Sequence, residues 1–373
     1  MTEGAIETAR GSRLADVVTL ADFERIAREL MEPAAFGYVA GGGWDEQTLA
    51  ENVDAWRRRR LRPRVLVDVS AVDARTTLLG MPVAMPVAIA PMATQVLAHP
   101  DAESAMTRGA AAAGVPMILS TSASQAIETV AAAVPDATLW FQLYVQRDMR
   151  FSRSLVERAA AAGFGAIVLT VDLPVLGYRP RDRRSGFVIP TMGNFAEAPP
   201  THGSHTPDPT NEVAGGNSRT LTWADVDVIR SWSTLPLVLK GILTREDAVI
   251  AVDHGAEAIV VSNHGARQLD RVPATADVLA EVVAAVAGRT EVWVDGGIRS
   301  GLDIVVALAL GARGVLLGRP AYWALAVGGA DGVERALAIL RKELEVALAL
   351  LGTPTPADVT PAHVAPAAPP ADR

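Results

Sequence analysis

The sequence contains no cysteine, so disulfide bonds, thiolate catalysis, iron–sulfur clusters and covalent haem attachment are excluded. It also lacks an excess of basic residues, because 34 Lys and Arg stand against 42 Asp and Glu, for a formal net charge of −8. Nucleic acid is therefore not an expected partner. No window of about 18 residues is free of charges and turn residues, so no membrane partner is expected either.

The amino-terminal residues 1–18 carry charges and lack an apolar core, which predicts no signal peptide and a cytoplasmic location. We also predict no metal site. Residues 19–31 have the pattern of a helix, in which Thr19 caps the start and Asp22 suits the positive helix terminus. Three glycines at 41–43 end this helical amino-terminal segment.

Half of the 373 residues are apolar, which is enough for one large core, and we predict one domain over residues 1–373. From residue 83 onward, short apolar runs alternate with Ala-rich helical stretches. Continuously apolar runs are typical of parallel strands that are covered on both faces. The runs are 87–92, 116–121, 139–145, 166–172, 235–241, 258–263, 291–296 and 314–320.

Eight such units predict an α/β fold, a (β/α)8 TIM barrel over about residues 83–350, and a doubly wound open sheet is the alternative. A long loop rich in Pro, Gly, Ser and Thr, residues 177–222, follows the fourth run. Such a loop is either a mobile lid over a site or a disordered linker, and we favour the lid. The Ala- and Pro-rich tail, residues 365–373, is expected to be disordered.

Polar residues gather at the carboxyl ends of the runs, which is where barrel enzymes build their active sites. A barrel with a purely structural role has little reason to place so many charged groups at one rim. The residues are Gln142, Tyr144, Thr170, Asp172, Lys240, His264, Arg267, Asp295, Arg299 and Arg319.

Two glycine-containing turns, DGGIRSG (295–301) and GRP (318–320), follow the seventh and eighth runs. Glycines let backbone N–H groups approach an anion, and the arginines add charge-assisted hydrogen bonds. Tight turns between strand and helix also require glycine, but two such turns with arginines at these places predict a phosphate-bearing ligand.

Lys240 ends an apolar strand, where it is suited either to forming a Schiff base or to acting as a fixed cation beside a cofactor that becomes anionic. His264 and Arg267 indicate a base beside an anion anchor. Asp172 and Arg179, after the fourth run, complete the group, since a carboxylate stabilises a protonated imidazole and two arginines grip a carboxylate.

The motifs VSNHGARQLD, LTVDLPVLGYRPRD, FQLYV, VLKGI, VDGGIRSG and LGRP, in this order, resemble the family of FMN-dependent α-hydroxy-acid oxidases and dehydrogenases, which includes glycolate, lactate and hydroxymandelate oxidases. The resemblance extends from about residue 14 to about residue 364. It implies that Arg179 and Arg267 pair with the substrate carboxylate, that Tyr38 and Tyr144 bond its carboxylate and hydroxyl, and that His264 takes the hydroxyl proton.

The same resemblance implies that Asp172 stabilises the imidazolium and that Lys240 favours the anionic reduced flavin, which argues against a Schiff base. It also implies a set of FMN contacts along the rim: Pro91, Met92, Ala93, Ser120, Gln142, Thr170, Lys240, Ser262, Asp295, Gly296, Gly297, Arg299, Gly318 and Arg319.

The expected reaction is oxidation of an (S)-2-hydroxy acid to the 2-keto acid, with O2 as electron acceptor and H2O2 as product. Ser122 stands where glycolate oxidase has an aromatic residue, so a wider pocket, for lactate or for larger aryl or branched acids such as mandelate, is expected. Met92 and Thr94 also depart from the glycolate-oxidase pattern, and Ala93 does not fix the electron acceptor.

Within the family, a dehydrogenase with a quinone or protein acceptor and a lactate 2-monooxygenase are alternatives. A flavin-dependent isomerase and a flavin-storage protein are remote ones, because neither calls for the carboxylate site of His264, Arg267 and Arg179. The resemblance also implies a homo-oligomer, a tetramer or an octamer.

Overall fold

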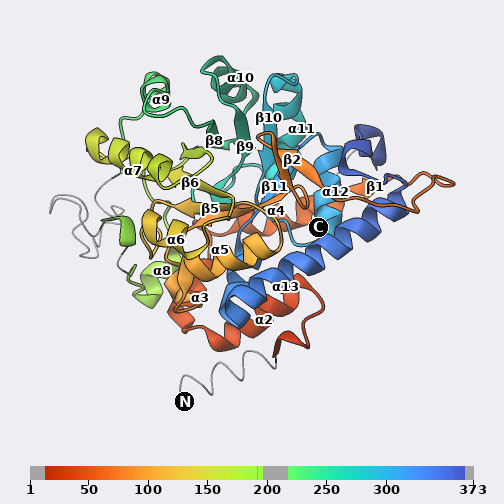
Figure 1. The fold of residues 1–373 in the computed structure, drawn as a ribbon, viewed down its shortest axis with the longest axis horizontal. Coiled ribbons are helices and arrows are strands. Elements are labelled where there is room, and N and C mark those ends of the chain that lie inside the picture. The colour runs from red at the N-terminus through yellow and green to blue at the C-terminus, as the bar shows by residue number, and fades with distance from the viewer. Residues whose placement is uncertain (1–12, 191, 196–216, 366–373) are drawn as a thin grey trace.

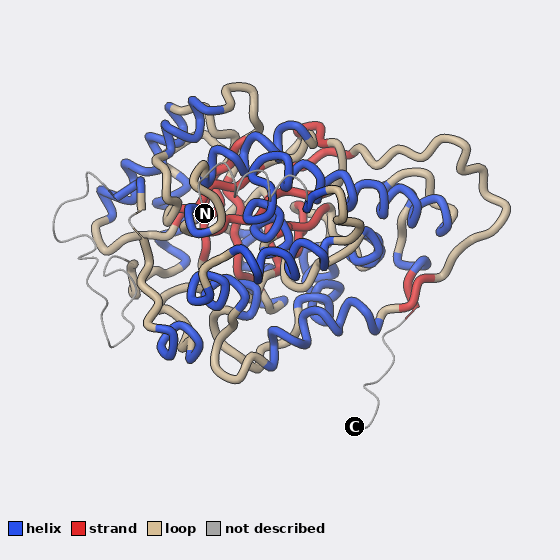
Figure 2. The backbone as a smooth tube through the Cα atoms, turned by 90° about the horizontal axis from the view of Figure 1, so that it is seen from below, coloured by secondary structure: helices blue, strands red, loops and turns tan. Residues whose placement is uncertain are grey.

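The computed structural model describes residues 13–190, 192–195 and 217–365. Eight parallel strands close into a barrel in the order β10-β11-β4-β5-β6-β7-β8-β9, which confirms the predicted fold and excludes the open sheet. Figure 2 shows the strands at the centre with helices around them. The strands are β4 (Val87–Met92), β5 (Met117–Ser120), β6 (Leu139–Leu143), β7 (Ile167–Thr170), β8 (Leu237–Ile242), β9 (Ala258–Val261), β10 (Glu291–Val294) and β11 (Gly314–Leu317).

Each predicted apolar run matches one strand, and only β8 extends past its run, by one residue. The helices outside the barrel are α5 (Ala102–Ala112), α6 (Ile127–Ala133), α7 (Met149–Ala161), α8 (Pro180–Ser185), α9 (Trp223–Arg230), α10 (Arg245–Asp253), α11 (Thr275–Val286), α12 (Gly301–Ala309) and α13 (Arg319–Leu351). The helix α13 packs against α5 and α12 and bends at Gly328 and Gly329, where the backbone leaves helical geometry (Figure 1).

The interior of the barrel is filled by side chains and is not a channel. Trp140 and Trp293 stack at its centre with ring centroids 5.1 Å apart, and the small and branched residues of the other strands surround them. The antiparallel hairpin of β2 (Thr76–Leu78) and β3 (Met81–Val83) packs Leu78 and Val83 onto the same cluster. This hairpin precedes β4, so it closes the end where the strands begin and leaves the carboxyl ends for a site.

The amino-terminal segment forms three helices: α2 (Leu20–Leu30), α3 (Pro33–Ala40) and α4 (Gln47–Arg58). The predicted cap is confirmed, since Thr19 and Asp22 form a capping box at the start of α2, which lies beside α13. The glycines after α3 have a steric reason. A Cβ on Gly43 would lie 2.4 Å from the carbonyl oxygen of Gln268, so this segment passes against the loop after β9 with room only for glycine.

Two boundaries differ from the predictions. The predicted loop is not plain, because residues 177–190 contain α8, residues 192–195 contain the short 3₁₀ helix η2 (Gly193–Phe195), and Asn194 is buried. Residue 191 and residues 196–216 of the predicted lid lie outside the described residues. The predicted disordered tail begins one residue too early, since Ala365 pairs with Arg60 between β12 (Val364–Ala365) and β1 (Arg60–Leu61). Residues 366–373 lie outside the described part.

The remaining short elements are the 3₁₀ helices η1 (Gln95–Leu97), η3 (His264–Ala266), η4 (Pro356–Asp358) and η5 (Pro361–His363). Within the described ranges, no helix combines the length and apolar character needed to cross a membrane.

Candidate active site

A cavity lies at the carboxyl ends of the barrel strands, and most of the predicted site residues line it. Those that do are Tyr38, Pro91, Met92, Ala93, Tyr144, Thr170, Arg179, Lys240, His264, Arg267, Asp295, Gly296, Gly297, Arg299, Gly318 and Arg319. The other predicted residues, Ser120, Gln142, Asp172 and Ser262, lie directly behind this lining and are joined to it or to one another by hydrogen bonds.

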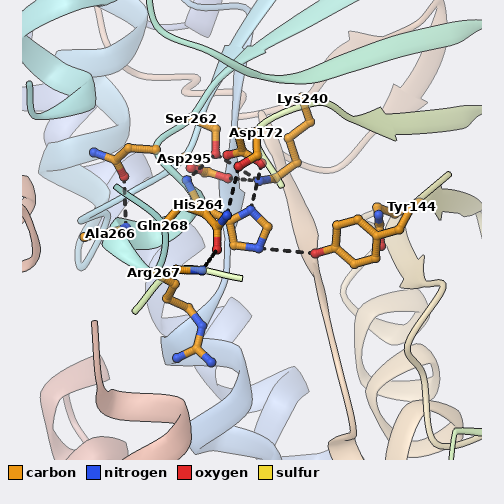
Figure 3. A network of polar contacts seen from close by, with 12 residues as sticks. Tyr144, Asp172, Lys240, Ser262, His264, Ala266, Arg267, Gln268 and Asp295 are labelled. Atoms are coloured by element: carbon orange, nitrogen blue, oxygen red, sulfur yellow. Dashed lines mark hydrogen bonds and ion pairs between the residues drawn. The ribbon is translucent and has the colours of Figure 1, made fainter. Parts of the chain in front are cut away.

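The imidazole of His264 is held from both sides (Figure 3). Its Nδ1 lies 2.9 Å from Oδ1 of Asp172, and its Nε2 lies 3.2 Å from the hydroxyl of Tyr144. Because a carboxylate only accepts hydrogen bonds, the ring hydrogen belongs on Nδ1, which leaves Nε2 as the acceptor. The backbone of His264 is left-handed, with φ of 59°, and its N–H donates to the hydroxyl of Ser262.

The surroundings of His264 favour the neutral form of its ring and the ionised form of the Asp172 carboxylate. Burial lowers the pKa of His264, and the opposing effect of Asp172 does not restore it. Burial also raises the pKa of Asp172, but His264 and Lys240 outweigh this effect, so the pKa of Asp172 falls below its usual value. A neutral imidazole with an unprotonated Nε2 at the cavity suits a general base at neutral pH.

Lys240 is a buried cation. Its Nζ lies 2.9 Å from the hydroxyl of Ser262 and 3.1 Å from Oδ2 of Asp295. Burial lowers the pKa of Lys240, but the carboxylates of Asp295 and Asp172 reverse the shift, and the pKa is raised overall. Since the neutral amine is the form that attacks a carbonyl, this environment favours the fixed cation over the Schiff base.

Two arginines bring positive charge to the same side of the cavity as His264. Arg179 is 5% exposed, and its Nε donates to the carbonyl of Arg267 at 3.1 Å. Burial and the neighbouring charge of Arg267 lower the pKa of Arg179 to about 10. The guanidinium of Arg267 lies 4.7 Å from the centre of the Tyr38 ring and donates to the backbone at the end of α3. An anion between the two guanidinium groups would relieve their repulsion.

The turn after β10, where the sequence predicts a phosphate site, is built on two glycines with left-handed backbone. Gly296 and Gly297 have φ of 88° and 85°, which glycine adopts without strain. The indole of Trp56, from α4, donates to the carbonyl of Gly296 at 2.7 Å and fixes the turn. Arg299 is half-buried, lines the cavity and donates to the carbonyl of its neighbour Ile298.

Arg319, predicted as a second phosphate contact, lines the cavity and also bonds the backbone of two neighbouring segments. Its guanidinium donates to the carbonyl oxygens of Val39 at 2.9 Å, Gly41 at 2.8 Å and Gly265 at 3.0 Å. Burial, together with the charges of Arg267 and Arg299, lowers its pKa to about 9. Arg319 therefore joins α3 to the loop after β9 and brings its charge to the cavity from there.

The residues present fit a flavin mononucleotide. Among the described residues, Gln142 Nε2, Thr170 Oγ1 and Asp295 Oδ1 are buried polar atoms without a hydrogen-bond partner. Leaving such atoms unpaired is costly, so a ligand with a polar ring edge and chain is expected to bond them. The glycine turn and Arg299 lie in the same cavity, where they suit the phosphate of that ligand.

Several lining residues were not predicted as site residues. Ile189, Met192, Phe195 and Asn217 come from the segment predicted only as part of a lid, and Gln146 and Tyr322 had no assigned role. The side chain of Asn194 explains the position of the first three, since its Nδ2 donates to the carbonyl of Thr121 and its Oδ1 accepts from the backbone of Ile127. No signal in the sequence distinguished these residues from ordinary loop residues.

The fold and the cavity define a class: a barrel flavoprotein whose rim carries a histidine–aspartate pair, two arginines and a glycine turn. The model of the FMN-dependent dehydrogenase family matches residues 27–366, and the chain belongs to this family.

Named relatives agree with this assignment. The L-lactate oxidase of Nostoc sp. is 48% identical over 344 residues, covering 90% of this chain and 94% of that protein. Glycolate oxidase 1 of Oryza sativa subsp. indica is 46% identical over 359 residues, covering 94% and 96%. Among solved structures, mandelate oxidase with (S)-4-hydroxymandelic acid has a TM-score of 0.88 at 43% identity, covering 94% of this chain and 98% of that one.

Proposed function

We propose that the protein oxidises an (S)-2-hydroxy acid to the 2-keto acid, with FMN as cofactor and O2 as electron acceptor. The observation that carries this proposal is that His264, whose ring contacts the carboxylate of Asp172, lines the same cavity as Arg179 and Arg267. A 2-hydroxy acid has its hydroxyl one carbon from its carboxylate, so a clamp on the carboxylate presents the hydroxyl to the base.

The residues of the chain divide the work as follows. Arg179 and Arg267 bind the substrate carboxylate, and their fixed positions orient the α-carbon. Tyr38, whose ring stacks on Phe187 with centroids 4.3 Å apart, closes the same side and bonds the carboxylate. Tyr144 donates to the substrate hydroxyl, and Nε2 of His264 takes the hydroxyl proton. Asp172 stabilises the imidazolium that results, while Lys240 keeps positive charge at the rim.

When bound, FMN supplies the acceptor for the two electrons that leave the substrate, and O2 then takes them up to give H2O2. Gln142, Thr170 and Ser262 are proposed to bond its ring and ribityl chain, with Pro91, Met92 and Ala93 as backbone walls and Ser120 behind Gln142. The Gly296–Gly297 turn and Arg299 are proposed to hold its phosphate, with Gly318 and Arg319 close by.

The substrate side chain is proposed to be apolar and larger than that of glycolate. Ser122, which is half-buried, lines the cavity where a bulky aromatic residue would fill it. Ile189, Met192 and Phe195 add an apolar surface to the same cavity. Burying the apolar side chain of (S)-lactate or (S)-mandelate against this surface is favourable, and glycolate has no such side chain. Both acids should therefore be turned over with a higher kcat/KM than glycolate. A clear preference for glycolate would contradict this proposal.

The matched variant Ser122→Trp tests the same point. It should lower kcat/KM for mandelate at least about tenfold, because the added ring occupies space that an aryl substrate needs. Turnover of glycolate should change much less. Equal losses for both acids would show that Ser122 does not set the width of the pocket.

The reaction itself is tested by its stoichiometry. One 2-keto acid and one H2O2 should form for each O2 consumed, as measured with an oxygen electrode, peroxidase-coupled dye and keto-acid derivatisation. A keto acid formed only when a quinone or a dye replaces O2 would instead indicate a dehydrogenase. A decarboxylated acid without H2O2 would indicate a monooxygenase.

We also propose a homo-oligomer in the cytoplasm. The support for the oligomer is an exposed apolar strip, Val65, Leu66 and Val67, in which Leu66 is fully exposed. Light scattering after gel filtration tests the oligomeric state, and fractionation of producing cells tests the location.

A further inference from the structure

The proposed base, its carboxylate partner and the two clamp arginines come from two loops that no shared strand pairing holds together. Asp172 and Arg179 follow β7, whereas His264 and Arg267 follow β9, and β8 separates these two strands in the barrel. The proposed reaction requires the His264–Asp172 contact and the spacing of the two arginines at the same time. Something other than the barrel ladder must therefore set one loop against the other.

The side chain of Gln268 makes this connection. Its Nε2 donates to the carbonyl oxygens of Asp172 at 3.0 Å and Val175 at 2.8 Å, and its Oε1 accepts the backbone N–H of Gly177 at 2.9 Å. Both amide hydrogens and the amide oxygen are thus bonded to the segment that runs from Asp172 toward Arg179. The residue is buried, with 8% exposed, so water does not replace these bonds at low cost.

The backbones of the two loops also touch at this point. A Cβ on Gly177 would lie 2.4 Å from the carbonyl oxygen of Arg267 and 2.8 Å from Cα of Gln268. That same carbonyl of Arg267 accepts the Nε–H of Arg179 at 3.1 Å. Gln268 thus lies next in sequence to one clamp arginine and bonds the backbone on the path to the other (Figure 3 shows Gln268 beside Arg267 and below Asp172).

We propose that Gln268 is a positioning residue that fixes the His264–Asp172 pair and the Arg179–Arg267 clamp relative to each other. This inference rests on the proposed function. Gln268 does not line the cavity and is not proposed to touch substrate or cofactor. Other side chains do not reproduce its bonds: Glu lacks donors for two carbonyls, Met and Leu lack any partner, and Asn is one methylene shorter.

The test compares Gln268→Met, which keeps the length and removes the hydrogen bonds, with Leu269→Ala at the adjacent residue, whose side chain is 62% exposed. Both variants are prepared as FMN-loaded enzymes and studied well below the midpoint of thermal unfolding. Two quantities are measured: the rate of anaerobic flavin reduction by (S)-lactate or (S)-mandelate, and the Kd of 2-hydroxy-2-methylpropanoate from its perturbation of the flavin spectrum. This acid has the hydroxyl and the carboxylate but no α-hydrogen, so it reports the clamp without turnover.

Gln268→Met should slow reduction at least about tenfold and raise the Kd of 2-hydroxy-2-methylpropanoate severalfold, while Leu269→Ala leaves both within about twofold. A destabilising substitution at the opposite end of the barrel, Leu78→Ala in the hairpin of β2 and β3, should lower the melting temperature without these changes. If Gln268→Met keeps both quantities within twofold of the wild type, or if Leu78→Ala reproduces its losses, the positioning role is overturned.

If Gln268→Met does not fold, Gln268→Asn decides by the same two measurements, because it retains the amide and displaces it by one methylene. Failure of the proposed function is a separate result, since wild-type flavin would then not be reduced by any 2-hydroxy acid.

Discussion

Nδ1 of His264 lies 2.9 Å from Oδ1 of Asp172, although the two residues are 92 positions apart in the chain. The barrel produces this contact because the carboxyl ends of all eight parallel strands open on one rim. Both side chains are mostly buried, at 15% and 14% exposed, so their interaction is weakly screened by solvent. The proposed chemistry depends on this pair.

Replacing the proposed base should abolish most of the reaction. His264→Gln removes the proton acceptor and should slow flavin reduction by about 10²–10⁴-fold, the usual contribution of a general base. FMN content and the Kd of 2-hydroxy-2-methylpropanoate should change little, because the arginine clamp remains. Stopped-flow reduction under anaerobic conditions measures the effect, and a loss below tenfold would assign the base to another residue.

The pH profile of kcat/KM should have one acidic limb, below the ordinary histidine value of about 6.5. Burial lowers the pKa of His264, Lys240 and Arg179 lower it further, and Asp172 opposes them. As the pH falls through this pKa the ring gains a proton and can no longer act as a base, so the rate falls. Tyr144 adds no basic limb near neutrality, since burial and Asp172 raise its pKa. A limb above 6.5 would contradict the structure.

Asp172→Asn should change both the pH of the acidic limb in the kcat/KM profile and the maximal kcat/KM reached above that limb. Without the carboxylate the largest influence that raises the pKa of His264 is gone, so the limb moves to lower pH. The imidazolium also loses its counter-charge, and the amide no longer fixes the ring hydrogen on Nδ1. We expect a loss of about 10²-fold or more in flavin reduction. A limb that moves to higher pH would exclude Asp172 as the partner.

The carboxylate clamp should affect binding more than chemistry. Arg179→Met removes a buried guanidinium whose Nε–H bonds the carbonyl of Arg267, and it should raise KM and the Kd of 2-hydroxy-2-methylpropanoate about 10–100-fold. Arg335→Met, at an arginine far along α13 that donates to the carbonyl of Val17, is the control and should leave both unchanged. Equal effects of the two substitutions would exclude a local role for Arg179.

The barrel interior should govern stability. Trp140→Ala empties part of the stacked pair with Trp293 and should lower the free energy of unfolding by about 3–5 kcal/mol. Chemical denaturation of the holoenzyme measures this loss, and bound FMN should be retained in the absence of denaturant. A change under 1 kcal/mol would mean that the interior repacks around the missing ring.

The strands and the rim were predictable from the sequence because buried parallel strands are short and continuously apolar, and the polar residues that end them stand out. His264, Lys240 and Arg179 were found in this way, and the family resemblance added their roles. The roles of Gln268 and Asp270 were not predicted, although both residues lie in the recognised motif VSNHGARQLD. Their partners are backbone groups far along the chain: Asp270 accepts the backbone N–H of Thr48 at the start of α4.

The hydrogen bonds of Arg319 were also not predictable, because their partners are backbone groups far along the chain. A glycine followed by an arginine indicates an anion turn, but nothing local reveals that carbonyls of α3 and of the loop after β9 lie within reach. The contribution of Met192 and Phe195 to the cavity was not predictable, because their segment has the composition of a loop. The hydrogen bonds of Asn194 and the short helix η2 fix the position of this segment.

The central claim is tested most directly by mixing the anaerobic holoenzyme with (S)-lactate, (S)-mandelate or glycolate in separate experiments, and then admitting air. The account predicts that the flavin absorbance bleaches faster with lactate or mandelate than with glycolate, and that it recovers rapidly with oxygen. An enzyme that bleaches and does not recover in air would contradict the oxidase assignment. A flavin that none of the three acids bleaches would contradict the proposed substrate class.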